Sequence, residues 1–199
     1  MFRRPRRALR RAMRRSFAPV AVPLGTLMPD APRRRLARAH GLIGAASYAE
    51  AAGMLAQLAA EAREAGHPRA AQIALEAGRA YMLAGQPETA LGEIREGLAM
   101  LADMGRWRIL RAAGLRAVDE LHQRGWTQQA EEVAAWLNAT LAGAPPEAAA
   151  TLRPAPSARP PLLPTHCPQC GGALHSDEVE WIDSHTAECG YCGSPVRTA

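Results

Sequence analysis

The sequence predicts a mostly α-helical protein with a small β-structured module at its C-terminus. Hydrophobic residues make up 48% of the 199 residues but aromatic residues only 5%. Alanine dominates the apolar content, and alanine is a strong helix former and a weak strand former. The middle of the chain is divided at intervals of 18 to 20 residues by Gly66, Gly85, Gly105, Gly125 and Gly143. Two Cys-x-x-Cys pairs then mark a separate unit near the C-terminus.

Positive charge is concentrated at the N-terminus. Residues 1–38 contain 12 of the 24 arginines and a single acid, Asp30, whereas the rest of the chain is net negative. The chain has no lysine, which together with its Ala, Arg, Gly and Pro content is typical of a GC-rich bacterial coding sequence. We expect residues 1–46 to form an arginine-rich, largely disordered head with a short helix over 31–43 that Asp30 caps.

The first part of this head has one amphipathic feature. A helix there would align Leu9, Met13 and Phe17 in a thin apolar stripe among arginines. Such a segment favours non-specific binding to polyanions, either a nucleic-acid backbone or an anionic membrane surface, and a solvated tail without a partner is the alternative. We expect residues 1–28 to be dispensable for folding, and Met13 or Met28 is an alternative first residue.

An export signal is a further interpretation of the head. The Arg-Arg-Ser-Phe run at residues 14–17 resembles the start of a twin-arginine signal. The uncharged run that follows is broken by three prolines and has no convincing cleavage site. No stretch of about 18 uncharged apolar residues is present, which excludes a transmembrane segment. We therefore expect a cytoplasmic protein.

Residues 47–142 are predicted to form a helical body of five antiparallel helices. Each interval between the glycines has apolar residues at helical spacing and is about four turns long. Ser47 and Glu50 have the spacing of a capping box at the first helix. Thr127 is a predicted N-cap of the last helix, and Pro87 fits a helix first turn.

Small residues and a tyrosine in this body follow a known repeat pattern. The spacing of Ala77, Gly78, Tyr81, Gly85 and Ala90 is similar to that of tetratricopeptide repeats, in which small residues let paired helices approach closely. The resemblance implies an antiparallel helical-repeat fold with a groove for a protein partner. Helix pairs recur here every 39–40 residues rather than every 34, which indicates relatives with longer helices.

A proline-rich linker follows the helical body. Residues 143–164 contain seven prolines and are expected to be semi-rigid, with a reach of about 60 Å when fully extended. We expect this linker to separate two units that fold independently of each other.

The strongest motif lies beyond the linker. Each Cys-x-x-Cys turn directs two thiolates at one point, and two such turns complete a tetrahedron around a zinc ion. The predicted ligands are Cys167, Cys170, Cys189 and Cys192, with 18 residues between the two pairs. Gly171 and Gly193, each directly after a second cysteine, permit the left-handed backbone that turns amides toward the sulfurs.

Residues 165–199 resemble a zinc ribbon. Alternating residues predict a strand over 178–182 and a returning strand over 186–188. A unit this small cannot fold on its apolar area alone, so we expect one structural zinc per chain. A rubredoxin-like iron site and two disulfides are the alternatives, and a histidine could replace a cysteine as ligand. The candidates for that replacement are His166, His175 and His185.

The net charge of the C-terminal unit and the absence of common catalytic motifs narrow the range of expected functions. Residues 165–199 carry a net charge of −4, which repels phosphate. The chain lacks the common nucleotide-binding, metalloprotease and serine-hydrolase motifs, so we expect no enzyme. The sequence favours a non-enzymatic adaptor that binds a protein partner in its helical groove. The alternative is a nucleic-acid-associated factor that grips phosphates through residues 1–38.

Overall fold

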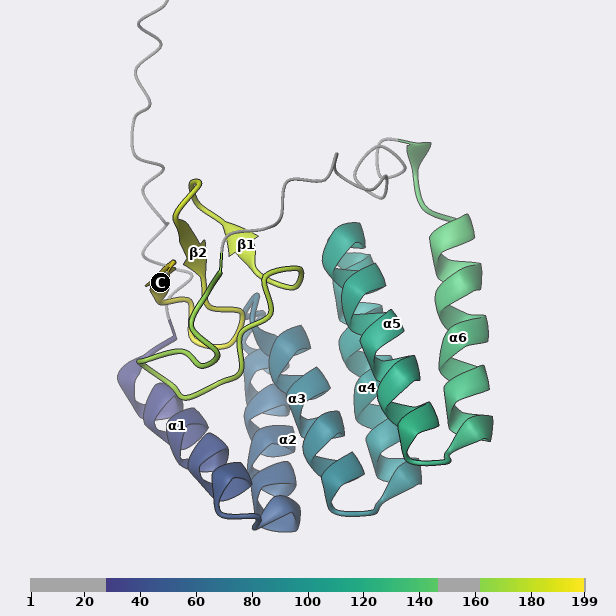
Figure 1. Cartoon of the computed structure of the whole chain (residues 1–199), viewed down its shortest axis with the longest axis horizontal. Coiled ribbons are helices and arrows are strands. Elements are labelled where there is room, and N and C mark those ends of the chain that lie inside the picture. The colour runs from purple at the N-terminus through teal and green to yellow at the C-terminus, as the bar shows by residue number, and fades with distance from the viewer. Residues whose placement is uncertain (1–27, 147–161, 199) are drawn as a thin grey trace, which may run out of the picture.

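The computed structural model describes residues 28–146 and 162–198, which form a row of helices and a small sheet (Figure 1). Consecutive helices run in opposite directions, and the row comprises α1 (Asp30–Gly44), α2 (Tyr48–Glu64), α3 (Ala70–Leu83), α4 (Pro87–Asp103), α5 (Trp107–Gln123) and α6 (Thr127–Ala142). The predicted mostly helical chain with a small C-terminal antiparallel sheet is confirmed. Within the described ranges, no helix has the length and apolar character needed to cross a membrane.

Glycines in the left-handed conformation end four of the helices. The φ angles lie between +63° and +76° at Gly66, Gly85, Gly105 and Gly125. At the end of α3 the N–H of Gln86 donates to the carbonyl of Tyr81 at 3.0 Å, and the N–H of Gly85 donates to that of Met82. The same pair of bonds closes α2, α4 and α5, which is the Schellman arrangement. The fifth spaced glycine, Gly143, has a φ of −84° and ends α6 without this turn.

The predicted side-chain caps are wrong at three helix starts. Ser47 is the N-cap residue of α2, but its φ and ψ of −84° and 58° are not those of an extended cap. Its hydroxyl makes no cap hydrogen bond, so no capping box forms. Asp30 is the first residue of α1 and pairs with Arg33 one turn later. Thr127 is likewise inside its helix, and Trp126 occupies the N-cap of α6.

Glycines also set the close contact between α3 and α4. A Cβ atom placed on Gly78 would lie 2.7 Å from Cγ1 of Ile94. A Cβ atom on Gly97 would lie 2.7 Å from Cγ of Leu75. Because both distances are far below van der Waals contact, a larger residue would push the two helices apart. The predicted close approach of paired helices at Gly78 is therefore observed.

The C-terminal residues 162–198, here called the cysteine module, contain a three-stranded antiparallel sheet in the order β1 (Glu180–Trp181), β2 (Thr186–Glu188) and β3 (Pro195–Arg197). The predicted returning strand over 186–188 is confirmed. The predicted strand over 178–182 is observed only at Glu180 and Trp181, and the carbonyl of Val179 before them accepts from Arg108 of α5. The strand β3 was not expected from the sequence.

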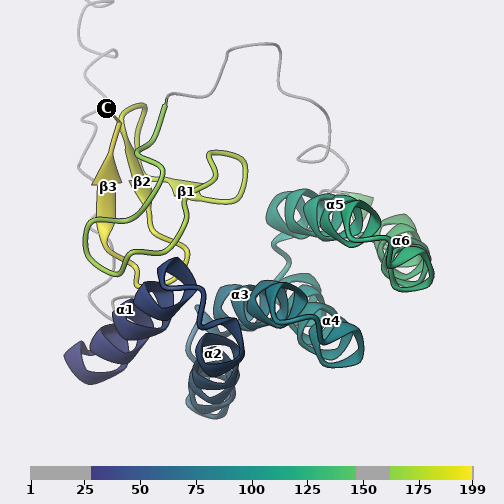
Figure 2. The same ribbon diagram turned by 60° about the horizontal axis from the view of Figure 1, so that its bottom comes forward.

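The cysteine module folds against the helices rather than apart from them. It lies over the side of the row formed by α1, α3 and α5, while α2, α4 and α6 face away (Figure 2). Its Val179, Tyr191 and Val196 belong to the same buried cluster as Leu36 of α1 and Ile73 of α3. The linker was expected to separate two units, whereas the structure packs the two parts against each other through shared apolar contacts.

The start of the described chain takes part in the same cluster. The predicted short helix of the head is present as α1, which packs against α2. Met28, just before it, is 5% exposed, and its N–H donates to the carbonyl of Cys192 at 3.1 Å. Dispensability of residues 1–28 stays a prediction, and its weakest point is Met28, because the deletion would remove this buried residue. Residues 1–27, with the Leu9, Met13 and Phe17 stripe, lie outside the described residues.

Candidate metal centre

Four buried sulfurs meet inside the cysteine module. The Sγ atoms of Cys167 and Cys192 are 3.8 Å apart, as are those of Cys170 and Cys189, and all four lie within 4.8 Å of one another. A tetrahedral site with metal–sulfur distances of about 2.3 Å requires sulfurs about 3.8 Å apart. A disulfide would need about 2.05 Å, and all four cysteines are free. The four cysteines are positioned to bind one metal ion.

The two Cys-x-x-Cys turns have the same backbone structure. Gly171 and Gly193 adopt φ angles of +74° and +77°, as predicted. Gly171 donates to the carbonyl of Cys167 at 2.9 Å, and Gly193 donates to that of Cys189 at 3.0 Å. The amide of Gln169 lies 3.4 Å from Sγ of Cys167, so backbone dipoles face the sulfur. Each turn thus presents two sulfurs from a rigid loop.

The chemistry of the sulfurs favours a cation between them. Hydrogen bonds with neighbouring thiols lower the pKa of Cys167 to about 7 and lower that of Cys192 as well. The same bonds raise the pKa of Cys170 and Cys189. A bound metal displaces the remaining protons, and four thiolates around a divalent ion leave a charge of about −2.

A buried arginine from the helices lies close to this charge. Arg69, at the start of α3, is 2% exposed and pairs with Glu188 of β2, directly before Cys189. Burial and repulsion from Arg106 lower the pKa of Arg69, while Cys189 and Cys192 oppose that shift. The guanidinium is therefore held in place by the negative charge that the cysteine cluster and Glu188 provide.

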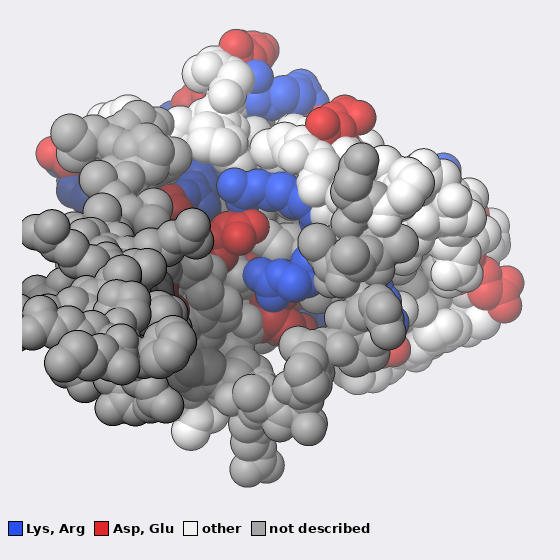
Figure 3. Space-filling view, turned by 90° about the horizontal axis from the view of Figure 1, so that it is seen from above, with Lys and Arg blue, Asp and Glu red and all other residues white. Residues whose placement is uncertain are grey.

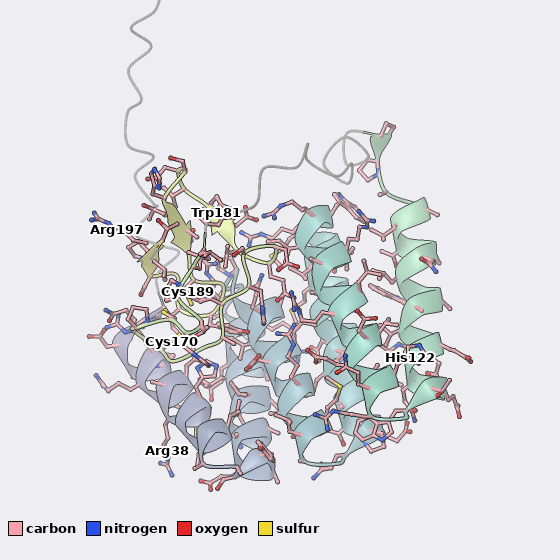
Figure 4. The ribbon with its side chains drawn as sticks, in the orientation of Figure 1. Arg38, His122, Cys170, Trp181, Cys189 and Arg197 are labelled. Carbon is pink, nitrogen blue, oxygen red and sulfur yellow. The ribbon has the colours of Figure 1, made fainter. Side chains whose placement is uncertain are left out.

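Helix α1 contacts the first cysteine turn directly. His40 Nδ1 donates to the carbonyl of Cys170 at 2.7 Å, and its ring meets the ring of Tyr191 edge to face, with centroids 5.3 Å apart. Gly172 packs closely against that tyrosine, since a Cβ atom added to the glycine would lie 2.5 Å from the ring. Figure 4 shows Cys170 and Cys189 where the module meets α1 and α3. Helices α1 and α3 thus pack directly against the metal centre.

Tyr191 links the same turn to α3. Its hydroxyl donates to Oε2 of Glu76 at 3.0 Å, and Glu76 in turn pairs with Arg79 at 3.4 Å. Burial and the nearby Glu76 carboxylate raise the pKa of Tyr191, which keeps the phenol neutral and able to donate. Gln72, one turn earlier on α3, packs against Gly190. The face of α3 that a helical wheel marks as polar is therefore buried beneath the module.

Arginines of α3 and α5 hold the loop before β1. Arg116 lies 2.6 Å from Glu178 and 3.0 Å from Asp177, and Arg79 lies 3.3 Å from Glu178. Burial alone would raise the pKa of Glu178, but Arg79 and Arg116 together lower it below its ordinary value. Figure 3, which views the molecule from above, shows acidic and basic side chains next to each other near the middle of that view. These contacts fix the module on the helices.

These helix residues were not predicted from the sequence, because their partners lie up to 130 positions away in the chain. The one local signal was the spacing of Leu36 and His40, which places the histidine on the apolar stripe of α1. The three histidines of the module lie outside the group of potential metal ligands found in the described residues: His166, His175 and His185. No family model, no curated protein and no solved structure matches this chain.

Proposed function

We propose that this protein is a non-enzymatic adaptor, in which a tetratricopeptide-like helical stack binds a protein partner and a zinc ribbon is a structural part of the binding body. Zinc suits the four sulfurs because it accepts tetrahedral thiolate coordination without redox chemistry. Four protein ligands leave no open position for a substrate, so the metal has a structural role. Free thiols suit the reducing cytoplasm of a bacterium.

One observation supports the adaptor function above the others: the face of α1, α3 and α5 holds a polypeptide. Arg108 donates to the carbonyls of Asp177 and Val179 at 3.0 and 2.7 Å, which are contacts to main-chain atoms two residues apart. Arg79 and Arg116 contact the Glu178 carboxylate between them. A surface that reads main chain and carboxylates together has the chemistry of a peptide-binding groove.

The nucleic-acid alternative rests on the arginines of the head. Among the described residues of this segment, Arg33, Arg35 and Arg38 each lie near a carboxylate of α1 or α2. Their charge is thereby partly neutralised. We propose that residues 1–27 bind nucleic acid or an anionic membrane surface. Such binding should weaken at high salt and should be lost when that segment is deleted.

Metal analysis tests the first half of the proposal. We expect one zinc per chain, and loss of that zinc in a Cys189→Ser variant, because three thiolates and a hydroxyl bind it more weakly. Arg197, exposed on β3, provides a matched control, since an Arg197→Ser variant should keep its zinc. Iron in the purified protein, or oxidised cysteines without metal, would contradict the proposal.

Site-specific photo-crosslinking tests the second half. A photo-reactive residue replaces Leu83, which lines a cavity between α3, α5 and the module, or Glu131, exposed on α6 far from the module. We expect one protein to crosslink at one of these positions and to form a complex of fixed stoichiometry when both partners are purified. The absence of such a complex from both positions, with the chain folded, contradicts the adaptor function.

A further inference from the structure

The face of α1, α3 and α5 is already occupied by the chain itself. Among the described residues, every ion pair across the boundary between the two parts joins an arginine of the helical part to an acidic residue of the cysteine module. The acidic side is made up of Asp177, Glu178, Glu180 and Glu188. The net −4 charge of the module therefore complements this one surface of the helical body.

The occupation depends on the cysteine centre. Both turns that carry the cysteines contact the N-terminal part of the described chain, through His40 of α1 to Cys170 and through Met28, just before α1, to Cys192. Tyr191, between two of the cysteines, is buried against Glu76 of α3. A metal held by the four cysteines ties the two turns together, so we expect these contacts to weaken when the metal is lost.

We propose that this face is a binding surface for acidic polypeptide segments and that the metal-loaded cysteine module is its built-in competitor, which leaves when the metal is lost. The inference rests on the proposed adaptor function and adds its regulation. A partner segment would carry two adjacent carboxylates followed by an apolar residue in a turn, as this segment does where the N–H of Glu178 donates to the carbonyl of His175 at 3.0 Å. That pattern matches Asp177, Glu178 and Val179, which now fill the contacts of Arg79, Arg108 and Arg116.

Tethering makes the competition effective. A binding module linked to its own site acts at an effective concentration in the millimolar range. The apparent affinity of a free competitor falls by the ratio of this effective concentration to the dissociation constant of the module for its site. A cavity of about 320 Å³ beside the docked module, lined by Arg79, Glu120, Arg124 and His175, leaves part of the charged surface open. An incoming acidic segment can contact Arg124 there before the module has left.

The test uses the full chain and a fluorescein-labelled peptide with the sequence of residues 174–182. Fluorescence anisotropy measures its binding to the metal-loaded chain and to the same chain after chelation. We expect the peptide to bind at least roughly tenfold more tightly after chelation, because the tethered competitor is gone. In the chelated chain, Arg116→Gln should weaken binding about tenfold. Arg95→Gln, which affects an exposed pair with Glu132 between α4 and α6, should have no effect.

A second variant keeps the proposal testable if chelation unfolds the helices, as circular dichroism would show. Glu178→Arg retains all four cysteines but repels Arg79 and Arg116, so the loaded chain should bind the peptide at least roughly tenfold more tightly than the loaded wild type. Equal peptide binding by the loaded wild type and by whichever open form stays helical overturns the proposal. A purified partner that crosslinks at Glu131 without displacing the module would leave the adaptor function intact and overturn only this inference.

Discussion

The two halves of the helical row are stabilised in different ways. Helices α4–α6 bury an apolar cluster that includes Leu98, Leu110 and Leu137 and to which α3 adds a few residues, among them Leu75. Helices α1–α3 share their cluster with the cysteine module. All the buried polar or charged residues among those described lie in α1, in the module, or in and directly before α3: His40, Arg69, Gln72, Glu76 and Ser194. Helices α4–α6 are thus stabilised by apolar packing between helices. Helices α1–α3 depend on the cysteine module, which covers their polar side chains.

This difference shows what this row of helices needs at each end. A helix whose polar side chains are buried beneath another unit loses their hydrogen bonds when that unit leaves, and each uncompensated group then has to be rehydrated or destabilises the fold. A helix with a simple apolar stripe has no such dependence. The stability of α1–α3 should therefore follow the state of the metal, and that of α4–α6 should not.

Metal removal is the largest perturbation of this comparison. After chelation we expect the backbone amides of α1 and α3 to lose hydrogen-exchange protection at least tenfold more than those of α5 and α6, a difference of about 1.4 kcal/mol in local stability. The reason is that the module takes its share of the first cluster with it when it unfolds. Exchange measured by mass spectrometry, with and without restored zinc, checks this. Uniform loss of protection along the row would show that the two halves are one cooperative unit.

Replacing the buried arginine should have the next largest effect. Arg69→Met leaves Glu188 without its partner in a buried site, and breaking a buried pair from one side costs about 3 kcal/mol. The same variant should bind zinc more weakly, because a positive charge near Cys189 is lost. Urea denaturation and a competition titration with a zinc chelator measure the two effects.

Arg35→Met provides the matched control. Arg35 pairs with Glu61 at 2.6 Å on the exposed surface, where such a pair is worth about 0–1 kcal/mol. Equal losses of stability in the two variants would mean that the Arg69–Glu188 pair is not specially important to the module.

Local sequence signals predicted the helices and the cysteine cluster well, and long-range packing was beyond them. The spaced glycines located the helix ends because a Schellman turn needs only its own residues. The Cys-x-x-Cys turns located the cluster for the same reason. Arg79 and Glu76 looked like an ordinary solvated helix face, and nothing local to α3 indicates that Tyr191 and Glu178 cover them. The proline-rich linker suggested separation, but the docking depends on surface complementarity between distant segments.

Two glycines of α4 test the contact between the halves. Gly97→Ala places a Cβ atom against Leu75 and the carbonyl of Ala71, so we expect a loss of about 1–3 kcal/mol. Gly92→Ala, in the same helix, meets no atom within 4 Å and should stabilise the protein by about 0.5–1 kcal/mol. Thermal denaturation of both variants gives the comparison. Changes of the same sign would show that α3 and α4 are not packed through Gly97.

A carboxylate near the boundary between the halves gives the smallest effect. Burial raises the pKa of Glu120 on α5 above its ordinary value, although Arg79 and Arg116 oppose the shift. A carboxyl whose pKa is higher in the folded state destabilises the fold when it is ionised, so this cost is present at neutral pH and disappears as the pH falls through the folded and then the unfolded pKa.

Glu120→Gln should accordingly stabilise the protein at pH 7 by less than about 1 kcal/mol, because a side chain that is 32% exposed is partly screened. The advantage should vanish near pH 3, about one unit below the ordinary glutamate pKa of about 4.3, where the wild-type carboxyl is protonated in both states. Urea midpoints of the two proteins at both pH values measure the difference, and Glu132→Gln, which removes an exposed carboxylate, should show no gain. A variant less stable than the wild type at pH 7 would mean that the 3.7 Å pair with Arg79 outweighs the burial of Glu120.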